Sequence, residues 1–227
     1  MKTASIDVVV PAYNEEAIIE ASVRELENTL SAFPLPHRIV VADNGSTDAT
    51  AACARRAGAE VLAVSERGKG AALVCAARAS EAPLFVFIDA DLSAHPRELA
   101  HFYAVMRERG ADLVIGSRLI SAEGINRSTL RTFSSLVFNL LRRLILGISV
   151  ADTQCGLKFM NERGRDILRE CEETGWFIDM ELLAKAERAG LVIIELPVAW
   201  EEFRYKGRVA KLNVVRDGIG AIGAMVR

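Results

Sequence analysis

Short runs of β-branched and aliphatic residues alternate with segments of helical periodicity along the first half of the chain. The strand-like runs are IDVVVP, HRIVVAD, EVLAV, LFVFID and DLVIG, and helical patterns lie between them, ending near Ser31, Ala57 and Ser80 and beginning again after Pro96. This alternation is typical of βαβ units, which form a parallel sheet covered by helices on both faces. We therefore predict that residues 1–118 form the α/β half of the protein. Its binding sites are expected where strands end and loops begin.

The pattern changes after Arg118. A turn-rich connector, ISAEGINRS, leads into TLRTFSSLVFNLLRRLILG, where apolar residues recur at three- and four-residue spacing from Leu130 to Leu144 and polar residues fall beside them. This spacing predicts an amphipathic helix. Two interpretations remain open: the helix packs on the core, or it lies at a membrane interface.

The rest of the chain contains the segment DTQCGLKFM, a helical pattern near Ile178 to Ala189 and the strand-like LVIIELPVAW. Between Arg204 and Arg227 there are six basic residues and a single acidic one, Asp217. Clustered basic residues are attracted to an anionic membrane surface. We therefore expect residues 119–227 to form the acceptor-binding half of the protein, with a basic C-terminal segment.

Composition narrows the class of protein. The 227 residues are 51% hydrophobic and carry a formal charge of −2, which favours one globular domain spanning residues 1–227 and argues against a nucleic-acid partner. The four cysteines form no CxxC pair, so reduced thiols in a cytoplasmic protein are expected. No secretory signal and no run of roughly 18 apolar residues is present, so any contact with a membrane is expected to be peripheral.

The sharpest chemical signal is the acidic pair Asp89 and Asp91 at the carboxyl end of the run LFVFID. Two carboxylates at a strand end can contribute to a Mg²⁺ or Mn²⁺ site that also binds a diphosphate. The pattern Asp-X-Asp is common by chance, so the pair alone is weak evidence for such a site.

Polar residues follow two other strands as well. Tyr13 and Glu15 follow the first, and Asp43 ends the second: Tyr13 offers a ring to a nucleobase, while the two carboxylates offer hydrogen-bond acceptors to a base or ribose. Taken singly, each residue suits an ordinary loop, in which Ser46 or Asp48 caps the next helix. Together with the acidic pair they stand at the first, second and fourth strand ends, and this coincidence favours a nucleotide site.

Ordered motifs carry a family resemblance. The segments VVVPAYNEE, DNGSTDAT, GKGAAL, DADLSAHP and IGSR resemble the signature blocks of family 2 glycosyltransferases with the GT-A fold. The segments DTQCGLKFM, FIDMELL and LPVAW, before a basic tail, resemble the dolichyl-phosphate glucosyltransferase and mannosyltransferase branch. The resemblance covers nearly the whole chain. It implies a Rossmann-like α/β fold with a mostly parallel central sheet flanked by helices and an amphipathic interfacial helix.

The resemblance also implies site residues. The nucleotide-sugar would be bound by a set of residues from the first, second and fourth strand ends and from the GKGAAL segment: Pro11, Ala12, Tyr13, Glu15, Asp43, Lys69, Asp89, Ala90 and Asp91. The metal ion, Mg²⁺ or Mn²⁺, would be held by Asp89 and Asp91. Ser93 stands where many mannosyl enzymes have a glutamine that joins the metal shell, and is the candidate third ligand.

Basic residues complete the implied catalytic set. Arg118 matches an arginine that contacts phosphate, and Arg131 falls where a second acceptor-side arginine is expected, although an interfacial arginine whose charge reaches water is an equal interpretation. Arg204 and Lys211 match, with a one-residue difference in loop length, a basic pair that closes over the diphosphate.

The implied activity is that of an inverting hexosyltransferase which uses a nucleotide-sugar donor, UDP-glucose first and GDP-mannose second, and a polyprenyl or dolichyl phosphate acceptor at the cytoplasmic face of a membrane. A lipid monophosphate has a second pKa of about 6 and is largely ionised, so it needs no general base. Two alternatives remain. A family 2 enzyme could act on a glycan or protein hydroxyl, with Asp152 or Asp179 as the base, or the chain could be a non-catalytic nucleotide-binding subunit.

Overall fold

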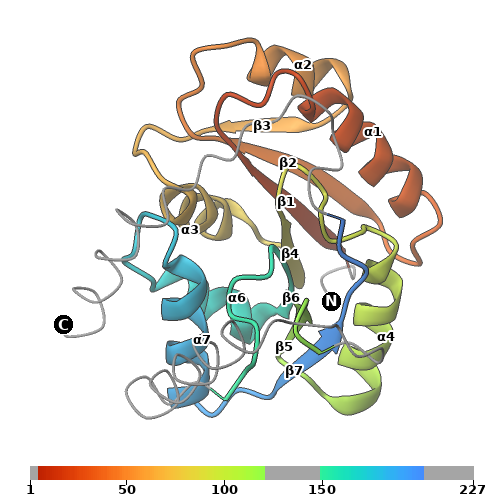
Figure 1. Cartoon of the computed structure of the whole chain (residues 1–227), viewed down its shortest axis with the longest axis vertical. Coiled ribbons are helices and arrows are strands. Elements are labelled where there is room, and N and C mark those ends of the chain that lie inside the picture. The colour runs from red at the N-terminus through yellow and green to blue at the C-terminus, as the bar shows by residue number, and fades with distance from the viewer. Residues whose placement is uncertain (1–4, 121–148, 202–227) are drawn as a thin grey trace, which may run out of the picture.

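The computed structural model describes residues 5–120 and 149–201, which form a central sheet between two layers of helices (Figure 1). The strands are β1 (Ile6–Ala12), β2 (His37–Asp43), β3 (Glu60–Ala63), β4 (Leu84–Ile88), β5 (Leu113–Ser117), β6 (Leu157–Asn161) and β7 (Ile193–Pro197). The helices are α1 (Ile19–Leu30), α2 (Thr50–Arg56), α3 (Lys69–Ala79), α4 (Glu98–Arg109), α6 (Glu162–Arg169) and α7 (Ile178–Arg188).

Within these residues the sheet has seven strands in the order β3-β2-β1-β4-β6-β5-β7. Strand β6 runs antiparallel to its neighbours β4 and β5, whereas every other neighbouring pair is parallel. The mostly parallel α/β sheet expected from the sequence is confirmed. The strands and helices expected between Ile6 and Ser117, the helix near Ile178 and the strand in LVIIELPVAW are all present.

Two apolar cores cover the two faces of the sheet. Helices α1, α2 and α4 pack on one face and helices α3, α6 and α7 on the other. Successive strand residues point to opposite faces, so Val86 and Ile88 of β4 join the first core while Phe85 and Phe87 join the second. Burial on both faces explains why these strands are apolar throughout rather than at alternate positions.

Strand β6 and helix α6 are elements that the sequence did not predict. In β6, Leu157 and Phe159 face the first core and Met160 faces the second, but Lys158 lies between them and interrupts the apolar run. Helix α6 follows at once, and its N-cap Asn161 accepts a hydrogen bond from the backbone N–H of Gly164 (3.1 Å). The consequence is an antiparallel strand inserted into an otherwise parallel sheet.

Two predicted features lie outside the described residues: the amphipathic helix of residues 130–144 and the basic segment of residues 204–227. In residues 5–120 and 149–201, no helix is both long enough and apolar enough to cross a lipid bilayer.

Candidate active site at the carboxyl edge of the sheet

The predicted site residues of the described chain gather at one edge of the sheet. Strands β1, β2, β4 and β5 are oriented alike, so their carboxyl ends share an edge, where they deliver Ala12, Asp43, Asp89 and Arg118. Ala12 and Asp43 are paired in register across β1 and β2. Because β6 is antiparallel, the segment that precedes it, residues 152–156, reaches the same edge. Open α/β sheets bind ligands at this edge.

The loops after β1 and β2 hold each other. The backbone N–H groups of Asn14 and Glu15 donate to the hydroxyls of Ser46 (3.0 Å) and Thr50 (2.8 Å). The carboxylate of Asp43 accepts the N–H of Ser46 at 3.2 Å. These contacts fix the loops that carry Tyr13, Glu15 and Asp43. Asn14 has a φ of 51°, which an asparagine adopts more readily than most residues.

Tyr13 has a basic neighbour that the sequence did not indicate. The guanidinium carbon of Arg67 lies 5.5 Å from the centroid of the Tyr13 ring, within the range of a cation–π contact. Pro11 and Ala12 are the last two residues of β1 and directly precede Tyr13. The predicted nucleoside residues of the first two loops are therefore brought together, while their role in binding stays a prediction.

Helix α3 begins with a close backbone contact. The N–H groups of Gly70 and Ala71 donate to the carbonyls of Gly175 (3.0 Å) and Thr174 (3.1 Å). A Cβ at Gly68 would lie 1.9 Å from the Thr174 carbonyl oxygen, and Gly68 has a φ of +126°. The glycines of the GKGAAL segment thus let the first turn of α3 meet the segment before α7. This contact brings Lys69 beside Asp179.

Four charged side chains, from the interior to the edge of the sheet, form an alternating series that we call the buried charge chain: Lys158, Asp179, Lys69 and Asp89. The ammonium of Lys158 pairs with Asp179, whose second oxygen lies 3.2 Å from the Lys69 ammonium. Lys69 also lies 3.0 Å from Asp89. The side chains of Lys158 and Asp179 are fully buried, whereas that of Asp89 is 29% exposed. Asp89 is therefore the member that faces outward.

Gly156 packs directly against Asp89. Its carbonyl accepts the backbone N–H of Asp89 at 3.1 Å, and a Cβ at this position would lie 2.0 Å from the Oδ2 atom of Asp89. A residue without a side chain is thus required here. The contact explains why a glycine stands in the DTQCG segment. It also fixes one side of the Asp89 carboxylate.

Asp91 is held by its own loop. Its Oδ1 atom accepts the backbone N–H of Ser93 at 3.2 Å, and the carbonyl of the preceding residue, Ala90, accepts the hydroxyl of Ser22 from α1 at 2.6 Å. Asp91 and Ser93 are both buried. Leu92 has a φ of 48°, an uncommon conformation for an apolar residue. The turn therefore holds Asp91 in place through main-chain contacts.

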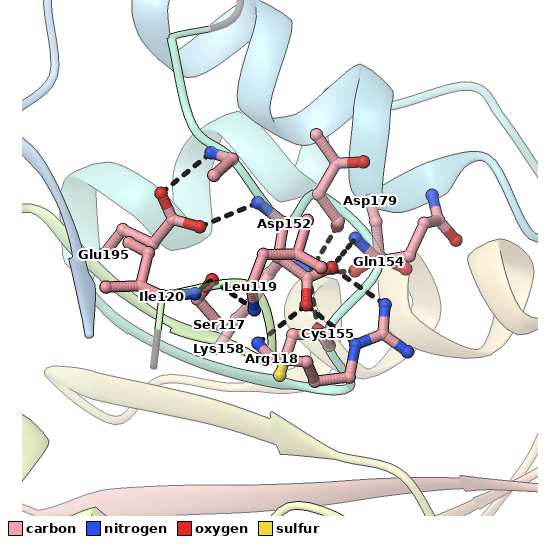
Figure 2. A network of polar contacts seen from close by, with 12 residues as sticks. Ser117, Arg118, Leu119, Ile120, Asp152, Gln154, Cys155, Lys158, Asp179 and Glu195 are labelled. Atoms are coloured by element: carbon pink, nitrogen blue, oxygen red, sulfur yellow. Dashed lines mark hydrogen bonds and ion pairs between the residues drawn. The ribbon is translucent and has the colours of Figure 1, made fainter. Parts of the chain in front are cut away.

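Arg118 is bound by a carboxylate. Its side chain donates two hydrogen bonds to Asp152, at 2.7 and 2.8 Å, and its backbone N–H donates a third at 2.9 Å. The backbone N–H groups of Ala151 and Asp152 donate to Glu195 of β7, and Figure 2 shows these contacts around Asp152. The guanidinium also lies 4.8 Å from the ring centroid of Trp200. Arg118 is thus fixed, and its side chain remains 33% exposed.

The charged state of these groups follows from their partners. Burial alone would raise the pKa values of Asp179 and Asp152, but Lys158 and Lys69 lower the first and Arg118 lowers the second below their usual values. Burial opposes the charge of Lys69 as well, yet Asp179 and Asp89 raise its pKa above the usual value. Asp179, Asp152 and Lys69 are therefore ionised near neutral pH. By contrast, burial raises the pKa of the Cys155 thiol to about 11, so it stays protonated.

The acidic pair fits a divalent cation that is shared with a substrate. The described residues contain no group of three or more His, Cys, Asp or Glu side chains that could hold a metal ion alone. Mg²⁺ and Mn²⁺ are commonly bound by one or two carboxylates together with substrate phosphates and water. Asp89 and Asp91 supply two carboxylates at a partly exposed strand end. The role of Ser93 as a third ligand stays a prediction.

Some predicted site residues are not described by the structure, and some residues of the observed site were not predicted from the sequence. Arg131, Arg204 and Lys211 fall in undescribed residues, so their predicted roles stay predictions. Lys158 is not among the predicted site residues, because a lysine is rarely fully buried. Trp200 belongs to the LPVAW motif, for which the sequence predicts no contact with Arg118. A place between apolar residues in LKFM is the one sequence signal that could have indicated Lys158.

Most of the chain is similar in sequence to known glycosyltransferases. Residues 7–166 match the family described as Glycosyl transferase family 2. The glycosyltransferase AglD of Haloferax volcanii is 34% identical over 232 residues, which cover 98% of this chain but only 36% of AglD. The dolichyl-phosphate beta-glucosyltransferase of Drosophila melanogaster is 31% identical over 218 residues, covering 87% of this chain and 67% of that protein.

Solved structures of sugar-transferring synthases are similar in fold to this chain. The glucosyl-3-phosphoglycerate synthase of Mycobacterium tuberculosis, solved in complex with Mn²⁺, UDP-glucose and phosphoglyceric acid, has a TM-score of 0.67 at 25% identity, with 97% of this chain and 76% of that chain covered. The mannosyl-3-phosphoglycerate synthase of Rubrobacter xylanophilus has a TM-score of 0.71 at 22% identity, with 98% and 73% covered. The second likeness concerns the fold alone.

Proposed function

This chain belongs to glycosyl transferase family 2, and on that premise we propose that it transfers a hexose, with inversion, from a nucleotide-sugar to a polyprenyl or dolichyl phosphate. The chain has the GT-A fold of glycosyltransferases that use activated sugars. The proposal takes residues 1–227 as one catalytic unit. Residues 1–118 bind the donor, and residues 119–227 bind the acceptor.

The donor we favour is UDP-glucose, with GDP-mannose second. Support comes from the Drosophila melanogaster relative, a dolichyl-phosphate beta-glucosyltransferase, and from the UDP-glucose bound to the Mycobacterium tuberculosis synthase. In this chain the nucleoside would lie against Tyr13, Glu15 and Asp43, whose loops are locked together by hydrogen bonds. Lys69, with its raised pKa, carries a positive charge toward the diphosphate.

A divalent cation would neutralise the leaving nucleoside diphosphate when it is bound, which is a common way of stabilising such a group. Asp89 and Asp91 would hold it, and the Mn²⁺ in the Mycobacterium tuberculosis complex supports this assignment. Mg²⁺ serves the same chemistry. We further propose that Arg204 and Lys211 contribute positive charge to the same diphosphate.

One observation carries the choice of acceptor: both candidate bases are fully engaged. Asp179 is bridged by two lysines, and Asp152 receives three hydrogen bonds from Arg118. Their pKa values are lowered, so each is a poor proton acceptor near neutral pH. A hydroxyl acceptor needs such a base, whereas an ionised phosphate does not. Arg118 and Arg131 would guide the anionic acceptor toward the donor.

A second candidate is transfer to a hydroxyl of a glycan, a protein or a small phosphorylated molecule. The phosphoglyceric acid bound to the Mycobacterium tuberculosis synthase favours it. In that case Asp152 or Asp179 would have to leave its ion pair before it could accept a proton. We propose the lipid phosphate first because both carboxylates are buried and held in ion pairs.

A labelling experiment tests the function. The protein is incubated with radiolabelled UDP-glucose or GDP-mannose and a short polyprenyl phosphate, with Mg²⁺, with Mn²⁺ or with EDTA. We expect label in the organic phase only when a cation is present. Label confined to water-soluble products would show that a polyprenyl phosphate is not the acceptor. Nucleotide binding without turnover on any acceptor would assign the chain to a non-catalytic subunit.

We also propose that the protein acts at the cytoplasmic face of a membrane as a peripheral protein, because an isoprenoid acceptor resides in the bilayer. The predicted amphipathic helix and basic segment, at residues 130–144 and 204–227, are the candidate contacts. Sedimentation with anionic vesicles tests this. Binding should weaken as the salt concentration rises, since exposed charges are screened.

A further inference from the structure

Lys158 is a buried cation without a part in the chemistry proposed above. It lies in the middle of β6, and its side chain is fully buried on the side of the sheet that α3, α6 and α7 cover. Its ammonium donates to the carbonyls of Thr153 (3.1 Å) and Cys155 (2.8 Å) and to the carboxylate of Asp179. Three donors and three acceptors satisfy the ammonium completely. Lys158 is therefore held in one position.

Asp179 links Lys158 to Lys69 through its two carboxylate oxygens. One carboxylate oxygen binds Lys158, and the other lies 3.2 Å from Lys69. Lys69 is also held against the rings of Phe87 and Trp176, at 5.6 and 5.7 Å from their centroids. A lysine side chain has a flexible four-carbon stem, so contacts of this kind decide where its charge lies. Here they leave the charge 3.0 Å from Asp89.

Stability alone is a weak reason for such an arrangement. Burying two charges costs desolvation, and buried ion pairs can often be replaced by apolar residues without loss of stability. The pair of Lys158 and Asp179 lies among apolar side chains of the second core, where an apolar pair would fill the same space. What an apolar pair cannot do is fix a neighbouring ammonium.

We propose that Lys158 and Asp179 are positioning residues, which act through Lys69 to hold the Asp89 carboxylate where the donor binds. This inference rests on the proposed function, in which Asp89 contacts the metal and the sugar diphosphate. If Lys158 is removed, Lys69 is the one cation left beside Asp179 among residues 5–120 and 149–201, so it shifts inward and releases Asp89. If Asp179 is removed, the Lys69 ammonium loses its inner anchor.

The experiment measures binding rather than turnover. The affinity of the protein for UDP in the presence of Mn²⁺ is determined by calorimetry for the wild type and for the double variant K158M/D179L, which removes both charges together. We expect binding that is roughly 10- to 100-fold weaker, the usual effect of losing a supporting contact around a metal ligand. The circular dichroism spectrum and the melting temperature should stay close to those of the wild type.

A matched control comes from Arg165, another buried cation. It lies on α6 and donates to the carbonyl of Ala82, which precedes β4 at the opposite edge of the sheet from Asp89. The R165M variant should lower the melting temperature and leave the affinity for UDP with Mn²⁺ unchanged. A general effect of removing a buried charge would instead weaken binding in both variants.

A milder variant and a double-mutant comparison separate positioning from folding. K158Q keeps an amide donor for the carbonyls, so it serves if the double variant does not fold. If Lys158 acts through Lys69, K158Q weakens the binding of UDP with Mn²⁺ when Lys69 is present. It then has no further effect on that affinity in a K69M background. Equal loss in both backgrounds would overturn the inference, as would a folded K158M/D179L variant with wild-type affinity.

The remaining outcomes are also decisive. If neither K158M/D179L nor K158Q folds, the pair belongs to the fold alone and the inference is wrong. If the wild type binds neither UDP nor GDP with Mn²⁺, the proposed function fails. If the wild type binds and the variants bind equally well, only the positioning role fails.

Discussion

Gly156 and Asp89 are in contact so close that a single methyl group at Gly156 would overlap the Asp89 carboxylate. The overlap arises because a Cβ at residue 156 would lie 2.0 Å from Oδ2 of Asp89. The same two residues are joined by a backbone hydrogen bond of 3.1 Å. The loop before β6 therefore forms one wall of the acidic pair that the proposed mechanism depends on.

The first prediction concerns this contact. In G156A the carboxylate of Asp89 must move, because the backbone around it is held by the sheet. If Asp89 positions the donor as proposed, a displacement of this size should lower kcat/KM by about 100-fold. Steady-state kinetics with UDP-glucose checks the effect. Gly110 is the control: it has a φ of +62° with nothing within 4 Å of a Cβ, so G110A should cost about 1 kcal/mol of stability and leave kcat/KM unchanged.

The second prediction concerns Asp91. D91N removes one negative charge and keeps the size of the side chain, so the hydrogen bond from the Ser93 N–H can persist. We expect weaker binding of UDP with Mn²⁺ and a fall in kcat of roughly 100- to 1,000-fold, as for loss of one transition-state contact. The exposed Asp166, which pairs with Arg169, provides D166N as a control without effect. Wild-type turnover in D91N would remove the acidic pair from the mechanism.

The third prediction is a dependence of stability on pH. The pKa of Asp152 is lower in the folded protein than the value of about 3.9 in an unfolded chain, because Arg118 outweighs the effect of burial. Its ionised form therefore stabilises the fold above about pH 4, and this stabilisation is lost as the pH falls through the folded value.

Thermal unfolding from pH 7 to pH 3 checks this. The melting temperature of D152N should lie below that of the wild type at pH 7, and the gap should narrow as the pH falls below about 4. A gap that stays constant over this range would contradict the prediction. D166N, which changes an exposed pair, should show little difference at any pH.

The fourth prediction separates the two acceptor classes. If the acceptor is a phosphate, kcat/KM should rise with pH as the acceptor ionises near its second pKa of about 6. A phosphonate analogue, whose second pKa is higher, should move the rising limb to higher pH. If the rising limb of the pH profile stays at the same pH with the phosphonate, it reports a group of the enzyme. That result would indicate a general base, and with it a hydroxyl acceptor.

Much of the fold could be predicted from the sequence, because the parallel strands are apolar on both faces and end in polar loops. The elements from β1 to β5 carry this signal clearly. Strand β6 does not, since Lys158 breaks its apolar run and its direction depends on pairing with β4 and β5. The paired residues are 69 to 77 positions apart in the chain for β4 and 43 to 47 apart for β5, and no local pattern reveals such pairing.

The candidate site was predicted in part. The strand-end rule places Tyr13, Asp43 and Asp89 at one edge, as the structure has them. The rule says nothing about which side chains pair, so the link between Lys69, Asp179 and Lys158 required the structure. The pairing of Arg118 with Asp152 likewise joins two segments that are adjacent only in the folded sheet.

The antiparallel insertion of β6 also fixes the order in which the sheet can be completed during synthesis on the ribosome. Strand β5 pairs with β6 and β7, both of which follow it in the sequence, so within the described chain it has no neighbouring strand when it emerges. Its partner arrives only with residues 157–161. Until then the nascent chain contains both aspartates of the acidic pair but neither Gly156 nor Lys158, so nucleotide binding should begin only late in translation.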